Sequence, residues 1–258
     1  LKTAIKFANI GCHIFIEKPL SHSFEGVKKL EEISSSKKIV TQIGCNLRFN
    51  PCLIKIKKIL SQKEIGKIIS FQAEHGSYLP DWHPNEDYKK SYAAKKENGG
   101  DIMFTSIHEV DYLYWFFGQV TEVFAKSGKY SNLRITSDDH ASMFLKFKNG
   151  IIGEIHLDYY QRPKTRTCKI IGTNGTIFWN NEENMVKIFQ SHTKKLQTIL
   201  KLHNFDINQM YIDEIRHFKK CVIKNKKSIN DIKQGIDTLK ISLCAKKSSE
   251  SNKMVKIS

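Results

Sequence analysis

The fold is decided by the stretch Cys12-His13-Ile14-Phe15-Ile16-Glu17-Lys18-Pro19, an apolar run that ends in two charged residues and a proline. A continuous apolar run of this length is typical of a parallel strand that is buried on both faces. A helical pattern follows at Val27, Leu30 and Ile33, and a second apolar run covers residues 39–43. Together these segments predict a β-α-β unit, in which a crossover helix joins two parallel strands.

Polar residues mark the ends of this unit. Residues 1–10 are expected to be the end of a helix, and Ser21 or Ser23 can cap the next helix. Ligands of open α/β sheets collect beyond the carboxyl ends of the strands. Lys18 and Asn46 stand at two such ends, so both are candidate binding residues.

The hydrophobic period changes along the rest of the chain. Pro51 starts a helix that Gly66 ends, and residues 67–75 then alternate between apolar and polar, as a half-buried strand does. Further alternating segments cover residues 122–130, 141–148, 150–159, 167–171, 176–179 and 185–190. Two closing helices have apolar faces, formed by Tyr211, Ile215 and Phe218 and by Ile229, Ile232, Ile236, Leu239 and Leu243. The prediction is an α/β segment followed by an α+β domain, whose open, mainly antiparallel sheet is covered by helices.

The composition narrows the class of protein. The 258 residues are 40% hydrophobic, which supports a buried core, and no apolar run approaches the length of about 18 residues that spans a bilayer. The start of the chain does not resemble a signal peptide, so we expect a cytoplasmic protein. The six cysteines contain no CxxC pair and lie in apolar patterns, which predicts reduced, buried thiols and no metal site.

The net charge of +16 raises nucleic acid as a partner, because lysine and arginine neutralise phosphates. The lysines are scattered from end to end, however, and the few arginines lie at Arg48, Arg134, Arg162, Arg166 and Arg216. Proteins that read bases concentrate arginine on one element. The charge is therefore interpreted as a solvated surface, with no nucleic-acid partner and no membrane partner expected.

A second decisive segment runs from Asn98 to Trp115. Two glycines open a predicted helix whose buried face is formed by Met103, Ile107, Val110 and Tyr114. Thr105, His108 and Asp111 share another face at three-residue steps. This pattern leaves two readings of His108 open, a hydrogen-bonded core histidine or a catalytic base.

Four ordered segments resemble the motifs of the Gfo/Idh/MocA family of nicotinamide-dependent oxidoreductases, which act on sugars, inositols and related polyols. They are Phe15-Ile16-Glu17-Lys18-Pro19-Leu20, Gly44-Cys45-Asn46-Leu47-Arg48-Phe49-Asn50-Pro51, Ile107-His108-Glu109-Val110-Asp111 and Ile171-Gly172-Thr173-Asn174-Gly175-Thr176-Ile177. Their order and spacing agree with the family over nearly the whole chain. The resemblance implies a partial Rossmann domain at residues 1–48 and a substrate-binding and oligomerisation domain at residues 49–258, with the last helix packing back on the first part.

The resemblance also implies roles for particular residues. In the family the lysine of the E-K-P segment reaches the nicotinamide and the substrate hydroxyl, and the helix histidine is the general base, so Lys18 and His108 are the expected catalytic residues. A base with a pKa near neutral suits removal of a hydroxyl proton, and an ammonium stabilises negative charge on oxygen. The cofactor, NAD or NADP, is expected to contact Glu17, Lys18, Pro19, Asn46 and Arg48. A homo-oligomer formed through the open sheet is implied as well.

The substrate is expected to be a sugar, a nucleotide sugar or a polyol. Trp82, Tyr88, Thr105, Arg162 and Tyr211 are the candidate substrate contacts. Aromatic and polar side chains suit sugar faces and hydroxyls, but loop aromatics also serve to fix a loop on the body of a domain. Both readings stay open for Trp82 and Tyr88.

The sequence departs from the family pattern in two ways. Phe104 and Thr105 occupy the positions where the compared members place an aspartate that orients the histidine, so we expect a weaker base or a compensating substrate contact; Asp111 could orient His108 or hold the helix in place. The G-x-G-x-x-G turn is absent from residues 1–258. We expect a fragment of a longer protein that alone neither binds NAD(H) tightly nor turns over. The alternative is a non-enzymatic homologue that acts as a binding or assembly subunit.

Overall fold

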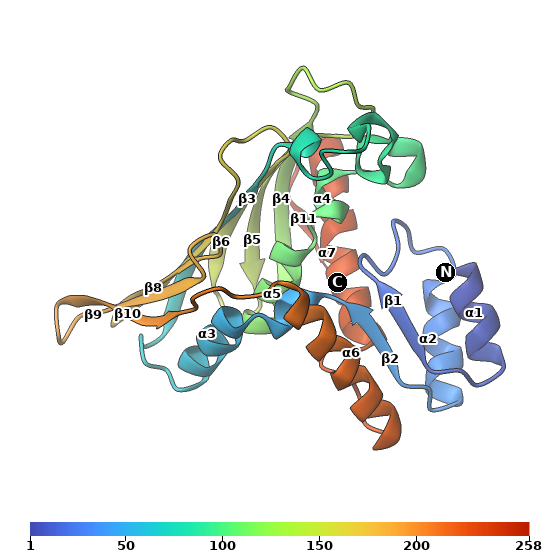
Figure 1. The fold of residues 1–258 in the computed structure, drawn as a ribbon, viewed down its shortest axis with the longest axis horizontal. Helices are drawn as coiled ribbons and strands as arrows, with labels where there is room; N and C mark the ends of the chain where they lie inside the picture. Colours follow the sequence, from blue (N-terminus) through green and yellow to red (C-terminus); the bar gives the residue numbers. More distant parts are fainter. Residues whose placement is uncertain (258) are drawn as a thin grey trace.

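The computed structural model describes residues 1–257 and contains two sheets, a parallel pair and a large mixed sheet (Figure 1). The helices are α1 (Lys2–Asn9), α2 (Val27–Ser36), α3 (Pro51–Ser61), α4 (Ile102–Thr105), α5 (His108–Phe117), α6 (Asn208–Ile223) and α7 (Ile232–Ser251). The strands are β1 (Ile14–Glu17), β2 (Thr41–Gly44), β3 (Ile68–Gly76), β4 (Val120–Gly128), β5 (His140–Phe147), β6 (Ile152–Asp158), β7 (Thr165–Gly172), β8 (Gly175–Asn180), β9 (Met185–Gln190), β10 (Lys195–Lys201) and β11 (Val255–Lys256).

The predicted β-α-β unit is present at the amino-terminal end. Strands β1 and β2 are parallel, with Ile14 opposite Thr41, and α2 connects them. Ala8, Leu30 and Ile43 form part of its core, so apolar side chains from both strands and helices exclude water there. The prediction that Ser21 or Ser23 caps α2 is wrong, because the N-cap is Gly26 in a left-handed conformation. Each serine hydroxyl instead accepts a hydrogen bond from a backbone amide two residues later.

The large sheet has nine strands in the order β10-β9-β8-β7-β3-β6-β5-β4-β11. Only the central pair β3 and β6 is parallel, and all other neighbours are antiparallel. The α/β plus α+β fold class and the mainly antiparallel sheet are thus confirmed. The edge strands β10 and β11 were not predicted, since β10 is largely exposed and β11 has two residues.

One face of this sheet is covered by helices. Helices α3, α4, α5 and α7 contact its strands, and Phe71, Val110 and Leu145 belong to the shared core. Side chains alternate across a strand, so every second residue points to the opposite face. The face opposite the helices, called the open face below, carries partly exposed apolar side chains, among them Phe124, Phe144, Phe178 and Leu196.

The last helix joins the two units. Helix α7 contacts β4 along the large sheet and also β2 and α2 of the parallel unit (Figure 1). Ile232 and Leu239 of α7 lie in the core of the parallel unit, and Ile241 and Ala245 lie in the core under the large sheet. The parallel unit and the large sheet are therefore held together by one continuous helix.

The segment predicted as one helix from residue 102 is two helices. Helix α4 ends at Thr105 and α5 begins at His108, and the side chain of Asp101 caps α4 by accepting from the Met103 amide. The glycine turn before α4 is present. Gly99 has a positive φ of +79°, and a Cβ at Gly100 would lie 2.2 Å from the Tyr92 backbone oxygen. The break places His108 at the start of a helix rather than in its middle.

Two burial predictions are wrong. Tyr211 and Ile215 of α6 are 47% and 52% exposed, so this face of α6 is largely uncovered within residues 1–257. Cys12 is exposed as well, since it precedes β1 in a surface turn, although all six cysteines are free thiols as expected. No helix within the described part of the chain is long and apolar enough to cross a membrane.

Candidate active-site cleft

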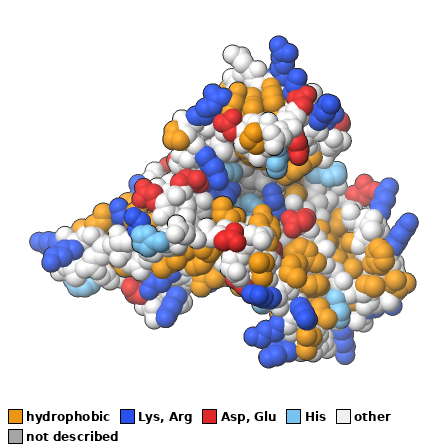
Figure 2. Space-filling model, viewed as in Figure 1, with side chains coloured by type: hydrophobic (Ala, Val, Ile, Leu, Met, Phe, Trp, Pro, Cys, Tyr) orange, Lys and Arg blue, Asp and Glu red, His pale blue; other side chains and the backbone are white. Residues whose placement is uncertain are grey.

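A cleft of about 590 Å³ lies where the carboxyl ends of β1 and β2 meet the loops of the large sheet, and its size is typical of ligand pockets. Figure 2 shows the surface hollowed between the upper lobe, which carries the loops around residues 79–100 and 129–137, and the parallel unit. Lys18 reaches into this cleft and its Nζ donates a hydrogen bond of 2.7 Å to the Thr105 carbonyl oxygen. This bond brings the end of β1 to the end of α4.

His108 lines the same cleft. The residue is 9% exposed, and Nδ1 is buried without a hydrogen-bond partner among residues 1–257. Burial, with the nearby charges of Lys18 and Arg166, lowers the pKa of His108 well below its usual range. The imidazole is therefore uncharged at neutral pH and able to accept a proton.

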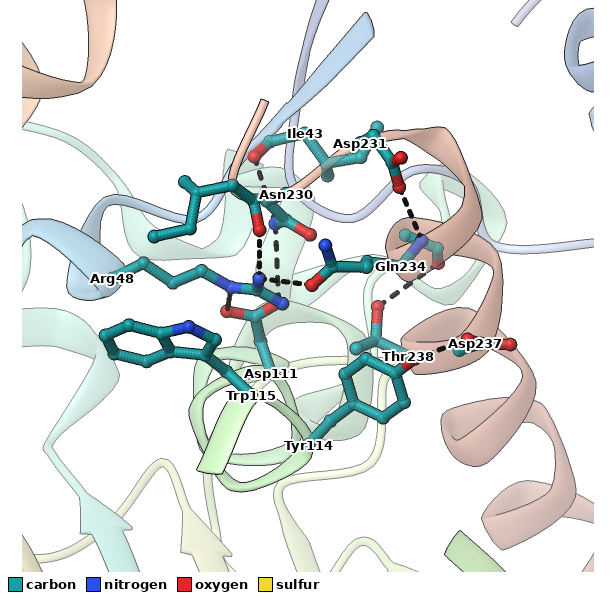
Figure 3. A network of polar contacts seen from close by, with 12 residues as sticks. Ile43, Arg48, Asp111, Tyr114, Trp115, Asn230, Asp231, Gln234, Asp237 and Thr238 are labelled. Carbon is teal, nitrogen blue, oxygen red and sulfur yellow. Dashed lines mark hydrogen bonds and ion pairs between the residues drawn. The ribbon is translucent and has the colours of Figure 1, made fainter. Parts of the chain in front are cut away.

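Asp111 does not orient His108. Its carboxylate accepts two hydrogen bonds of 2.8 Å from Nε and Nη2 of Arg48, and a third from the Asn230 amide at 3.3 Å (Figure 3). Of the two roles predicted for Asp111, the structure supports the one that holds the helix in place.

Arg48 is not among the residues of the cleft, although it was predicted to contact the cofactor. It is 1% exposed, and Nη1 donates to the Ile229 carbonyl and to Gln234 at 2.6 Å each. All three guanidinium nitrogens are thus engaged by the protein, because burying a charge requires such partners. Figure 3 shows this guanidinium between α5 and α7 with Trp115 beside it.

The other predicted cofactor residues follow β1 and β2. Asn46 lines the cleft and is buried, whereas Glu17 and Pro19 flank Lys18 without lining it. Glu17 is exposed at the end of β1. Lys18 and Asn46 are therefore the two residues that the carboxyl ends of the parallel strands bring to the cleft.

The predicted substrate residues separate into two groups. Trp82, Thr105, Arg162 and Tyr211 line the cleft. The Trp82 indole donates to Ser77 at 2.8 Å, and the Arg162 guanidinium lies 3.2 Å from the centre of the Tyr78 ring. The Thr105 hydroxyl is buried without a hydrogen-bond partner in the described chain.

Tyr88 lies outside the cleft, in a smaller adjoining pocket that shares Trp82. Its hydroxyl accepts a hydrogen bond of 3.2 Å from the backbone amide of Arg134. The structure therefore supports the reading in which Tyr88 fixes its loop on the domain.

Three residues of the site were not predicted. His75 and Arg166 are direct cross-strand neighbours on β3 and β7, and both line the cleft. The Glu109 carboxylate lies beneath them, 2.9 Å from Arg166 Nε and 4.0 Å from His75 Nδ1. The one local signal was the alternation of β3, which places His75 on the same face as the buried Phe71 and Ala73.

Burial dominates the acid–base properties of this group. It lowers the pKa of His75 well below its usual range, assisted by the charge of Arg166, and it raises the pKa of Glu109, which is fully buried. His75 Nδ1 also lies 3.2 Å from the Ser106 hydroxyl. Within residues 1–257, no group of His, Cys, Asp and Glu side chains could hold a metal ion.

A model of the GFO/IDH/MocA C-terminal domain matches residues 53–178, which include α3, α4, α5 and strands β3 to β7. Residues 53–178 therefore belong to the GFO/IDH/MocA C-terminal domain family.

Sequence relatives within the family carry the names of sugar and inositol dehydrogenases. Levoglucosan dehydrogenase of Pseudarthrobacter phenanthrenivorans is 27% identical over 205 residues, which are 69% of this chain and 52% of that protein. Scyllo-inositol 2-dehydrogenase (NAD(+)) of Bacillus subtilis is 25% identical over 230 residues, 87% of this chain and 65% of that protein. The chain thus spans about half to two thirds of the length of these relatives.

Solved structures agree on the GFO/IDH/MocA fold. Levoglucosan dehydrogenase in complex with NADH superimposes with a TM-score of 0.91 at 20% identity, covering 100% of this chain and 76% of the other. An oxidoreductase domain protein from Kribbella flavida gives a TM-score of 0.90 at 16% identity, with 100% and 77% coverage. At such low identity the likeness shows the fold alone.

Proposed function

We propose that the protein is an NAD(P)-dependent oxidoreductase that transfers a hydride at a carbinol or carbonyl carbon of a sugar, nucleotide sugar or polyol. The observation that carries the proposal is the hydrogen bond from Lys18 Nζ to the Thr105 carbonyl, which brings an ammonium and the uncharged imidazole of His108 into one cleft. The relatives named as NAD-dependent sugar and inositol dehydrogenases support the same reading.

The residues present fit the nicotinamide end of such a cofactor. Lys18 and Asn46 follow two parallel strands, and nucleotides bind beyond the carboxyl ends of parallel strands. Lys18 and Asn46 would contact the nicotinamide portion, with Glu17 and Pro19 on either side of Lys18 shaping the turn after β1. A bound nicotinamide supplies the acceptor for the hydride that leaves the carbinol carbon.

The protein's own residues handle the proton and the charge. His108 accepts the hydroxyl proton as the C–O bond becomes a carbonyl, since its ring is uncharged and its accessible edge faces the cleft. The Lys18 ammonium stabilises negative charge that develops on the same oxygen. Thr105 occupies one of the positions of the missing aspartate and lines the cleft, but its hydroxyl is buried, so its backbone carbonyl, which accepts from Lys18, is its polar contact there.

The same proposal covers domain organisation and assembly. Residues 1–48 act as the nicotinamide-facing part of a dinucleotide-binding domain, and residues 49–258 bind substrate. A second copy of the chain covers the open face of the large sheet, where Phe124, Phe144 and Phe178 are between 37% and 40% exposed. A cytoplasmic location fits the six free thiols, of which Cys12 is exposed.

A substrate panel tests the catalytic part of the proposal. Protein expressed from the complete coding region is mixed with NAD⁺ or NADP⁺ and with sugars, inositols and uronates, and nicotinamide absorbance is followed. We expect reduction with at least one compound, and Lys18→Ala and His108→Ala to lower kcat by about 100-fold or more, the typical contribution of acid–base catalysis.

The matched control is Lys28→Ala, which removes an exposed lysine of α2 away from the cleft and is expected to leave kcat unchanged. No reduction with any compound, together with intact binding of a sugar, would support the non-enzymatic binding subunit instead.

A further inference from the structure

Arg166 is built into the cleft by a buried carboxylate. Its Nε lies 2.9 Å from Glu109 Oε1, and the Glu109 side chain is 0% exposed whereas that of Arg166 is 13% exposed. The Nε side of the guanidinium is therefore paired with the protein, and part of the side chain stays accessible. Opposite charges attract strongly at this depth, so the pair keeps the guanidinium against the carboxylate although Nε has no hydrogen-bond partner of good geometry.

The two terminal nitrogens of Arg166 are not bound by other residues of the described chain. Neither Nη1 nor Nη2 has an acceptor within residues 1–257, and unlike Nε neither is fully buried. A guanidinium whose two terminal nitrogens point the same way matches the two oxygens of a carboxylate, with two parallel hydrogen bonds. The free edge of Arg166 is thus a preformed receptor for a planar anion.

Arg162 and Lys164 add positive charge beside Arg166. Residues 162 and 164 precede β7 and residue 166 lies on it, and all three line the cleft with Lys18. Arg162 lies 3.8 Å from Asp81 and Lys164 lies 3.6 Å from Glu182, with all four side chains between 38% and 69% exposed. Ion pairs this long and exposed are weak, so they leave the cleft attractive to an anion.

We propose that the substrate carries a carboxylate, as a uronic or aldonic acid does, and that Arg166 binds it while Lys18 and His108 act on a neighbouring carbinol. This inference rests on the proposed function and goes beyond it, because neutral sugars and polyols offer no anion for this edge. The positive potential also agrees with the low pKa of His75 and His108, to which Arg166 contributes.

Paired sugars test the proposal. Binding of D-glucuronate, D-galacturonate and D-mannuronate is measured by titration calorimetry, in the presence and absence of NAD⁺. The reference ligands are D-glucose, D-galactose and D-mannose, which carry a neutral hydroxymethyl group in place of the carboxylate. We expect at least one uronate to bind about 10-fold or more tightly than its neutral partner, since a two-point ion pair contributes on the order of that factor or more. Binding of D-glucose 6-phosphate is measured as well, to distinguish recognition of a carboxylate from recognition of a phosphate.

Three variants test whether the preference for uronates depends on Arg166. Arg166→Lys keeps the charge but loses the two-point edge, and is expected to weaken uronate binding by about 10-fold without changing binding of the neutral sugar. Arg166→Gln combined with Glu109→Gln removes both charges, so no buried carboxylate is left unpaired if the single variant fails to fold. Lys169→Gln is the control, because Lys169 lies on the same strand but faces the opposite side of the sheet.

The outcomes separate this proposal from the proposed function. Equal binding of every uronate and its neutral partner, a preference that survives the double variant, or tighter binding of the phosphate would overturn the carboxylate proposal. Hydride transfer from neutral sugars alone would do the same and leave the oxidoreductase function standing. Arg166-dependent uronate binding without hydride transfer from any compound to NAD⁺ would contradict only the oxidoreductase function.

Discussion

The guanidinium of Arg48 and the carboxylate of Asp111 form a two-point ion pair, with both hydrogen bonds 2.8 Å long and the side chains 0% and 1% exposed. Arg48 follows the parallel unit and Asp111 lies on α5, one turn after His108. Because Arg48 also binds Ile229 and Gln234 beside and on α7, the pair connects three distant parts of the chain beneath the cleft (Figure 3).

Breaking this pair should destabilise the protein strongly. Asp111→Asn leaves the guanidinium buried without its counter-charge, and we expect the free energy of unfolding to fall by about 3–5 kcal/mol. Urea denaturation measures the change. Glu32→Gln, which removes the exposed partner of Lys28 on α2, is the control and should cost less than about 0.5 kcal/mol. A loss below about 1 kcal/mol for Asp111→Asn would contradict this role for the pair.

The two cleft histidines should make stability fall on acidification. His75 and His108 have a lower pKa in the folded chain than the unfolded value of about 6.5, so the unfolded state takes up protons first as the pH drops. The stability they allow at about pH 7 is lost as the pH falls through the unfolded value toward the folded one.

Urea unfolding at about pH 7.5 and pH 5 measures this dependence. His75→Gln and His108→Asn should each reduce the stability lost between those values by more than about 1 kcal/mol. His203→Gln, at an exposed position, should leave the loss as in the unmodified protein. An unchanged loss in both cleft variants would show that other groups cause it.

Glu214 on α6 should make the stability of the protein fall as the pH rises, the opposite of the effect of the two histidines. Burial, assisted by the charge of Glu17, raises the pKa of Glu214 to about 8. The pKa of Glu214 in the folded chain lies above the unfolded value of about 4.3. The contribution of Glu214 to stability is therefore fully present below about pH 4.3 and is lost as the pH rises through the folded pKa. Glu214→Gln should therefore stabilise the protein by more than about 1 kcal/mol at about pH 9, measured by urea denaturation. The exposed Glu250→Gln is the control, and equal stability of Glu214→Gln and the unmodified protein at that pH would refute the assignment.

Gly100→Ala should disturb the turn that precedes α4. A Cβ there would lie 2.2 Å from the Tyr92 backbone oxygen and 2.6 Å from that of Lys95, so the backbone must move. We expect a loss of about 1–3 kcal/mol in the free energy of unfolding, as for other overpacked sites. Gly128→Ala meets only the side chain of the exposed Tyr130 and should change stability by less than about 0.5 kcal/mol. Similar values for both variants would contradict a tight turn at Gly100.

The sequence determined the local elements and the class of fold. The apolar run of β1, the alternation of β3 and the glycine turn before α4 are encoded by neighbouring residues, since strand and helix periods follow from backbone geometry within a few positions. Lys18 could be singled out by its place after an apolar strand, and His108 by the helix face that it shares with Thr105 and Asp111. The motif order then identified the family, which the match over residues 53–178 confirmed.

Only the tertiary structure decided which side chains meet. The parallel pairing of β3 with β6, the burial of Arg48 against Asp111 and the group of His75, Glu109 and Arg166 all join residues far apart in the chain. The break between α4 and α5, and the exposure of Tyr211, likewise depend on what packs against each segment. Contacts of this kind are set by the cost of burying charges and by the space left between packed elements, and a local pattern carries neither.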